Sequence, residues 1–159
     1  MSYVQSVLQP DERVKYVTDI HWIIFLPGIA LFILAVLFYL LAVSTTSVFA
    51  FWAGIAFFFL ILAVIALLSA WFQRVTTEIA VTDRRIIYKR GFISRRTIEM
   101  EMDKVESVDV DQSVMGRLLD YGDIIIRGVG VGIEPLKKIG SPIEFRNHLL
   151  GERSKRGSK

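Results

Sequence analysis

WIIFLPGIALFILAVLFYLLAV, residues 22–43, is a run of 22 residues without an aspartate, glutamate, lysine or arginine. As a helix it would be about 33 Å long, enough to cross the roughly 30 Å hydrocarbon core of a bilayer. A second uncharged run, residues 48–72, follows after STTS at 44–47. Neither run has the polar face of a helix on a soluble domain. The sequence therefore predicts a transmembrane hairpin with helices at 22–43 and 48–72 and a short external turn at 44–47.

A secretory signal peptide does not explain the first run, because the run is too long and a second one follows almost at once. The flanking charges predict the orientation. Arg13 and Lys15 precede the first run, and the turn carries no cation. Five cations follow the second run within about 20 residues: Arg74, Arg84, Arg85, Lys89 and Arg90. Because lysine and arginine are enriched in cytoplasmic flanks, we expect the N-terminal segment 1–21 and the C-terminus to be cytoplasmic.

Small residues recur every seven positions in both runs. They are Gly28, Ala35 and Ala42 in the first run and Ala56, Ala63 and Ala70 in the second. Close backbone approach along small residues is a main source of helix association in lipid. We therefore predict that the two stripes pack against each other. Two alternatives stay open: the spacing is a chance feature of alanine-rich helices, or one stripe mediates homo-oligomerisation.

From residue 73 onward the apolar residues alternate with polar ones. VTTEIAVT (75–82) and RIIYKRG (85–91) predict a β-hairpin, and FISRRTIEMEM (92–102) and VESVDVDQ (105–112) predict further antiparallel strands. DIIIRGVG (123–130) and GIEPLKKI (132–139) predict the last two, with SVMGRLLDYG (113–122) as a compact connection. Residues 73–150 thus form a mainly antiparallel β domain.

SPIEFRNHLL, residues 141–150, predicts a helix that closes the domain. Ser141 fits the N-cap position, Pro142 the first helical position, and Glu144 completes a capping box. Phe145, Leu149 and Leu150 would then face the core. The basic tail, residues 151–159, is expected to be flexible.

Several segments together resemble the bacterial pleckstrin-homology-like family, whose members place two transmembrane helices before a PH-type domain. They are LQPDERVKY and HW before the first helix, EIAVTDRRIIYKRGFISR and KVESVDVDQSVMGRLLDYGDIII in the β domain, and SPIEFR near the end. The resemblance implies a PH-like barrel or roll capped by the C-terminal helix. It also implies anchoring in the bacterial inner membrane as a multi-pass protein with both termini cytoplasmic, and, more weakly, a binding role.

The charge of the β domain is unevenly distributed. Residues 74–96 contain seven cations and two acids, whereas residues 99–111 contain six acids and one lysine. One interpretation is that adjacent strands of opposite sign neutralise each other through cross-strand pairs. The other is that the cations face the anionic cytoplasmic leaflet. The residues expected to contact a lipid or a partner are Arg84, Arg85, Lys89, Arg90, Arg95 and Arg96.

Most catalytic and cofactor chemistry finds no support in the sequence. The chain has no cysteine and only two histidines, His21 and His148, so we expect no metal site and no cofactor. No G-x-S-x-G motif is present. Ion pathways usually contain ionisable residues, and the uncharged runs contain none apart from Tyr39. The basic stretch lacks the interleaved aromatics of nucleic-acid binders.

The sequence therefore predicts a non-catalytic membrane-anchored module that does not bind nucleic acid. It would engage a membrane protein partner or a second copy of itself. The alternative is recognition of anionic lipid headgroups through the basic hairpin.

Overall fold

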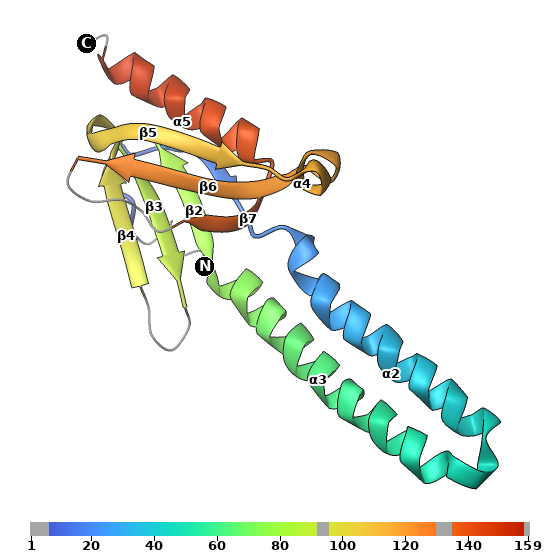
Figure 1. The fold of residues 1–159 in the computed structure, drawn as a ribbon. Coiled ribbons are helices and arrows are strands. Elements are labelled where there is room, and N and C mark those ends of the chain that lie inside the picture. The colour runs from blue at the N-terminus through green and yellow to red at the C-terminus, as the bar shows by residue number, and fades with distance from the viewer. Residues whose placement is uncertain (1–6, 92–95, 130–134, 158–159) are drawn as a thin grey trace. The chain divides into compact units, whose positions relative to one another are not determined.

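The computed structural model describes residues 7–91, 96–129 and 135–157 and divides into two compact units. One unit, here called the apolar hairpin, is Trp22–Phe72. The other, here called the sheet domain, combines Met1–His21 with Gln73–Lys159. Segments from both sides of the hairpin thus build one domain (Figure 1).

The sheet domain contains two antiparallel sheets. The first has the strand order β1 (Val14–Thr18), β2 (Glu78–Thr82), β3 (Arg85–Arg90) and β4 (Arg96–Glu101). The second has the order β5 (Val105–Asp111), β6 (Tyr121–Gly128) and β7 (Leu136–Gly140). The short 3-10 helix η3 (Met102–Lys104) joins the two sheets, and α4 (Val114–Leu118) joins β5 to β6. The predicted hairpin and the later strands are confirmed within the described residues, whereas the predicted strand residues 92–95, 130 and 132–134 lie outside them.

β1 was not expected from the sequence, which assigned no structure to residues 1–21. β1 pairs with β2 in the register Tyr16↔Val81 and Thr18↔Ile79. The apolar hairpin is therefore an insertion between two neighbouring strands of one sheet. Beyond β1 the chain turns onto the second sheet, where Ile20 bridges Ile139. The sheets meet at this corner without closing into a barrel, so the architecture is a PH-like roll.

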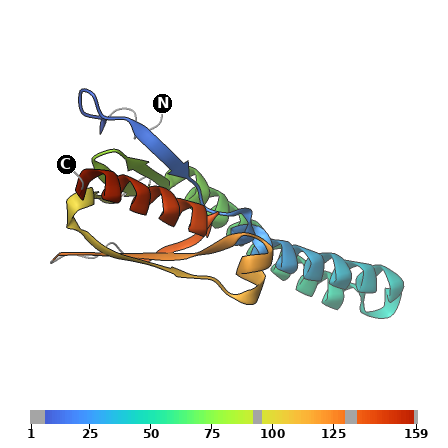
Figure 2. The same cartoon turned by 90° about the horizontal axis from the view of Figure 1, so that it is seen from above.

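The core lies between the two sheets and beneath the C-terminal helix α5 (Pro142–Gly157). Figure 2 shows α5 running alongside the sheets. Ile79 and Ile86 of the first sheet, Ile124 of the second, and Phe145 and Leu149 of α5 are all buried in one cluster. The predicted burial of Phe145 and Leu149 is confirmed.

The start and the end of α5 differ from the prediction. Ser141 has a φ of 46°, which lies outside the extended region of an N-cap residue, and its hydroxyl donates to Asp120 Oδ2 at 2.6 Å. Glu144, the expected capping-box partner, accepts a hydrogen bond from the Tyr16 hydroxyl at 3.4 Å. At the other end the helix continues through Gly157, where the sequence predicted a flexible tail. Arg153 Nη1 donates to the Glu106 carbonyl at 3.1 Å and so ties this extension to β5.

The apolar hairpin consists of η1 (Trp22–Phe25), α2 (Leu26–Ser44), η2 (Thr46–Val48) and α3, which begins at Phe49 and continues to Thr76. The segments Trp22–Ser44 and Phe49–Thr76 are each long and apolar enough to cross a membrane. Their large apolar side chains, such as Leu37 and Phe57, are exposed. A helix pair that exposes this much apolar surface is typical of a hydrocarbon environment.

The small residues singled out in the sequence lie along the contact between the two helices. The buried residues of α2 are Gly28, Ala35 and Ala42, and those of α3 are Ala56, Ala63 and Ala70. A Cβ added at Gly28 would lie 2.7 Å from Leu67 Cδ2. The close approach of the helices therefore depends on small side chains at these positions.

Candidate binding surfaces of the sheet domain

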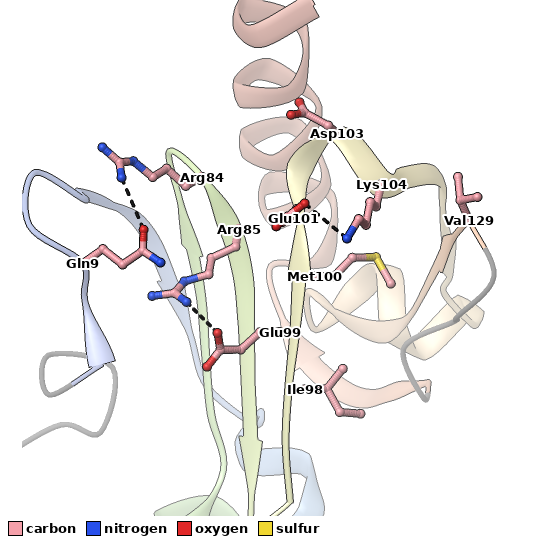
Figure 3. A pocket seen from close by; sticks show the side chains of 10 residues that line it. All are labelled: Gln9, Arg84, Arg85, Ile98, Glu99, Met100, Glu101, Asp103, Lys104 and Val129. Carbon is pink, nitrogen blue, oxygen red and sulfur yellow. Dashed lines mark hydrogen bonds and ion pairs between the residues drawn. The ribbon is translucent and has the colours of Figure 1, made fainter.

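A pocket of about 830 Å³ lies along β4 (Figure 3). Four consecutive residues of β4, 98–101, line it. Successive side chains of a strand point to opposite faces, so a pocket that meets all four must follow the edge of the strand. Among the described residues β4 pairs with β3 alone, so the edge of β4 that faces away from β3 is open.

The two sides of this pocket differ in chemistry. Arg85 and Glu99 lie on one side of β4, and Met100 lies on the other, toward Val129 (Figure 3). Val129 is exposed, and Met100 is 6% exposed. The rim of the pocket includes Glu101, which is ion-paired with Lys104 at 3.3 Å. The pocket therefore offers a strand edge, an apolar floor and a charged rim.

Arg85 forms a buried ion pair with Glu12. Its Nη2 and Nε donate to the two carboxylate oxygens at 2.8 and 3.0 Å. The Thr82 hydroxyl donates to the same carboxylate at 2.7 Å. The Glu12 side chain is fully buried, and that of Arg85 is 14% exposed. Arg85 also reaches Glu99 at 2.6 Å and the Val7 carbonyl at 2.8 Å, so its donors are engaged within the domain.

These contacts shift the protonation equilibria of both partners. Burial alone raises the pKa of Glu12. Hydrogen bonds from Arg85, the Gln9 N–H and Thr82 outweigh this effect, so the pKa of Glu12 lies below its ordinary value of 4.5. The hydrogen bond to Glu12 in turn raises the pKa of Arg85. The pair is therefore fully charged at neutral pH.

The other predicted contact residues are spread over both ends of the first sheet. Arg84 Nη1 donates to Gln9 Oε1 at 3.3 Å, and Lys89 is ion-paired with Glu78 at 3.5 Å. Arg90 and Arg96 are exposed and face each other in the β3–β4 register. Arg95 lies outside the described residues. The structure therefore does not bring these cations together into one surface.

The antiparallel order of the strands determines which cations lie at the end of the first sheet where the chain continues into the apolar hairpin. The β2–β3 turn, with Arg84 and Arg85, is at one end of the sheet. The end of β3 and the start of β4, with Arg90 and Arg96, are at the other end, together with the end of β1 and the start of β2. Because β3 has six residues, these ends are about 20 Å apart. The chain enters and leaves the apolar hairpin at the Arg90 end.

A smaller pocket, of about 410 Å³, opens at this same end between the two sheets. Its apolar walls include Ile79, Tyr88 and Leu136. It is also lined by two cations and a threonine, namely Arg90, Lys137 and Thr77. Thr77 is 4% exposed, and its hydroxyl has no hydrogen-bond partner within the described part of the chain. A buried hydroxyl without a partner costs about 1–3 kcal/mol, which a bound acceptor would offset.

No local sequence pattern singled out the residues that define both ends of the first sheet. Glu12 stands in a short polar segment before the hairpin, and no local pattern links it to Arg85. Thr77 and Lys137 belong to strand-like segments where a polar residue is unremarkable. Of the two interpretations of the charge pattern, pairing between adjacent strands describes Arg85 and Glu99, although Arg85 makes more bonds to Glu12.

Groups suited to metal binding or catalysis do not gather in the described residues. No cluster of three or more histidine or acidic side chains that could hold a metal ion occurs among them. His148 stacks on Tyr16 with ring centroids 4.7 Å apart, and His21 stacks on Tyr121 at 5.4 Å. Both histidines thus have packing roles.

Comparison with known protein families agrees with the architecture. The family model of the bacterial PH domain matches residues 16–153, which begins in β1 and ends in α5. The chain belongs to the bacterial PH domain family. Since the match spans both sides of Trp22–Phe72, the apolar hairpin lies within the region that the family model covers. Bacterial PH domains are typically non-catalytic and serve as binding or scaffold modules. No curated protein and no solved structure shows significant similarity to the chain.

Proposed function

We propose that this bacterial PH-domain protein is a non-catalytic module anchored in the bacterial inner membrane that binds an extended segment of a membrane protein partner along β4. The apolar hairpin crosses the membrane twice, with both termini in the cytoplasm. The observation that carries the partner proposal is the open edge of β4 inside the 830 Å³ pocket.

A strand edge binds an extended peptide mainly through backbone hydrogen bonds. The pocket adds side-chain selectivity, because Ile98 and Met100 line it as apolar groups while Glu101 and Asp103 lie at its rim. An incoming strand with alternating apolar and basic residues fits this arrangement. The membrane anchor favours a partner in the same membrane, since tethering raises its effective concentration at the pocket.

Site-specific photo-crosslinking in intact membranes tests this proposal. A photoreactive residue is placed at Thr97 or Glu101 of β4 and, as control, at the exposed Ile143 of α5. We expect a discrete adduct from the two β4 positions and none from Ile143. The double substitution Glu101→Lys and Asp103→Lys should reduce the Thr97 adduct several-fold. Adducts of equal yield at all three positions, or an adduct insensitive to charge reversal, would argue against the β4 site.

Recognition of anionic lipid headgroups is a second candidate, but of the six residues expected it retains Arg90 and adds Lys137 and Thr77. Arg85 is ion-paired with Glu12, and Lys89 with Glu78. These pairs argue against a lipid-binding face along the whole β2–β3 hairpin. The smaller pocket favours a lipid phosphate instead, because Arg90, Lys137 and the unpartnered Thr77 hydroxyl line it together.

Lipid retention by the full-length protein tests this candidate. After purification from membranes, native mass spectrometry would compare bound phosphatidylglycerol in the parent protein and in the double variant Arg90→Ala and Lys137→Ala. We expect the variant to lose most of the bound lipid, whereas a control with Arg127→Ala and Arg146→Ala, both exposed and outside this pocket, keeps it. Equal lipid content in all three proteins would exclude this pocket as the site.

A further inference from the structure

The helix α4 exposes apolar residues that a soluble surface normally covers. Val114, Met115 and Leu118 are 74%, 54% and 76% exposed. The residue that α4 buries is instead Gly116. A short helix that directs its apolar side chains outward and its glycine inward is the reverse of an ordinary amphipathic surface helix. Exposed apolar groups gathered in this way mark an interaction site.

These side chains project from an ordered element. Ser113 caps the helix, because its hydroxyl accepts a hydrogen bond from the Gly116 N–H at 3.0 Å. The Leu119 N–H bonds to the Met115 carbonyl at 3.0 Å. A Cβ on Gly116 would lie 2.6 Å from the Tyr121 carbonyl oxygen, so glycine lets α4 rest directly on β6. The exposure of the apolar residues is thus built into the fold.

A chain of direct contacts links α4 to the point where the chain enters the apolar hairpin. Gly116 rests against Tyr121, and the Tyr121 ring stacks on His21 at 5.4 Å. The His21 N–H is held by the Lys138 carbonyl at 2.7 Å. The residue after His21 is Trp22, the first of the hairpin. Within the sheet domain, α4 therefore lies beside the last residue before the hairpin.

We infer that α4 inserts Val114, Met115 and Leu118 into the interfacial layer of the membrane that the hairpin crosses. The inference rests on the proposed membrane anchoring. Continuity with the hairpin entry selects the bilayer as the occupant, since the anchor holds this corner of the domain at the membrane surface. Arg117 is exposed between the apolar residues and suits contact with anionic headgroups. α4 is a second, shallow membrane contact that limits rotation of the domain about its tether.

The absence of cysteine from the chain allows a direct test in the full-length protein. Single cysteines at Leu118 and at Val114 are labelled with the polarity-sensitive fluorophore NBD, and the protein is reconstituted into vesicles that contain phosphatidylglycerol, because an anionic surface attracts nearby lysine and arginine side chains. Quenching by doxyl-labelled lipid is then compared with quenching by aqueous iodide.

Two reference positions separate the possible outcomes. Ile61 is exposed on α3 and reports on the hairpin itself. Val129 is 65% exposed but lies at the other end of β6, about 27 Å from Tyr121. We expect lipid quenching at Leu118 and Val114 to exceed that at Val129 about threefold or more, with emission shifted to the blue.

The two proposals fail in different ways. If the Ile61 label is not quenched by lipid, membrane anchoring itself is wrong. If Ile61 is quenched while Leu118 and Val114 behave like Val129, only the α4 contact is overturned. Labels on α4 that are shielded from iodide yet untouched by lipid quenchers would assign α4 to a protein partner and would equally overturn the inference.

Discussion

The guanidinium of Arg85 holds both carboxylate oxygens of Glu12, at 2.8 and 3.0 Å, although the whole apolar hairpin lies between these residues in the sequence. The pair joins the segment before the hairpin to the β2–β3 turn after it. Together with the pairing of β1 and β2, it makes the N-terminal segment part of the sheet domain.

Glu12→Ala should destabilise the sheet domain by about 3–5 kcal/mol, because the buried guanidinium of Arg85 loses its main partner. Arg85 keeps its bond to Glu99, which favours the lower end of that range. Thermal unfolding of the full-length protein in detergent, followed by circular dichroism, measures the effect. The exposed Glu106→Ala is the matched control and should leave the midpoint almost unchanged. A midpoint equally insensitive to both substitutions would mean that the pair contributes little.

The same pair predicts a loss of stability in acid. The folded state lowers the pKa of Glu12 below 4.5. The contribution of this carboxylate is therefore present above the unfolded pKa and is lost as the pH falls through the lower folded value. Unfolding midpoints recorded between pH 7 and about pH 3 should decline more steeply in the parent protein than in Glu12→Gln. Parallel curves would rule out Glu12 as a source of the acid sensitivity.

A fragment that starts at Gln73 should not fold stably. It lacks β1, Tyr16 and Glu12, so β2 loses its outer neighbour and Arg85 its carboxylate. A variant in which a short glycine–serine loop replaces Trp22–Phe72 keeps every strand, and we expect it to be soluble and folded. Dispersion of amide signals in proton NMR spectra distinguishes the two. A well-dispersed spectrum from the fragment would show that β1 is dispensable.

Ala63→Leu should weaken the contact between α2 and α3. Ala63 is fully buried, and added side-chain volume in a well-packed site typically costs about 1–3 kcal/mol. The same substitution at the exposed Ala30 of α2 is the control. Heat-induced aggregation of detergent-solubilised protein should begin at a lower temperature for Ala63→Leu than for Ala30→Leu. Identical temperatures would indicate that the helices do not depend on the small residues.

Local patterns predicted most of the fold. The two uncharged runs, the β2–β3 hairpin and the alternation of Ile98, Met100 and Met102 each follow from residues close together in sequence. The family resemblance, carried by segments along nearly the whole chain, added the PH-like architecture. The six small residues of the hairpin were also identified from spacing alone, and each is buried in the structure.

The features that sequence reasoning missed depend on distant partners. β1 is a five-residue strand that precedes a long apolar run. Its partner β2 follows the apolar hairpin, so the two strands are far apart in the sequence. Glu12 likewise pairs with Arg85, which lies on the other side of the apolar hairpin in the sequence. The last helix was predicted to end at Leu150, with a flexible tail from Gly151. Glycine inside a helix costs about 1 kcal/mol relative to alanine, yet α5 continues through Gly151 to Gly157. The contact of Arg153 with β5 accompanies a helix that continues past it.

The insertion of the hairpin between β1 and β2 also bears on how the protein is made. β1 leaves the ribosome before either apolar helix, while its partner β2 follows the second one. If only one helix crossed the bilayer, β1 and β2 would be stranded on opposite faces, and the first sheet would lack its outer strand. In the membrane topology that we propose, assembly of the first sheet therefore depends on both helices having crossed the bilayer. A chain in which one helix alone had crossed would leave one edge of β2 unpaired and Arg85 without Glu12. Exposed defects of this kind are what cellular quality control would act on.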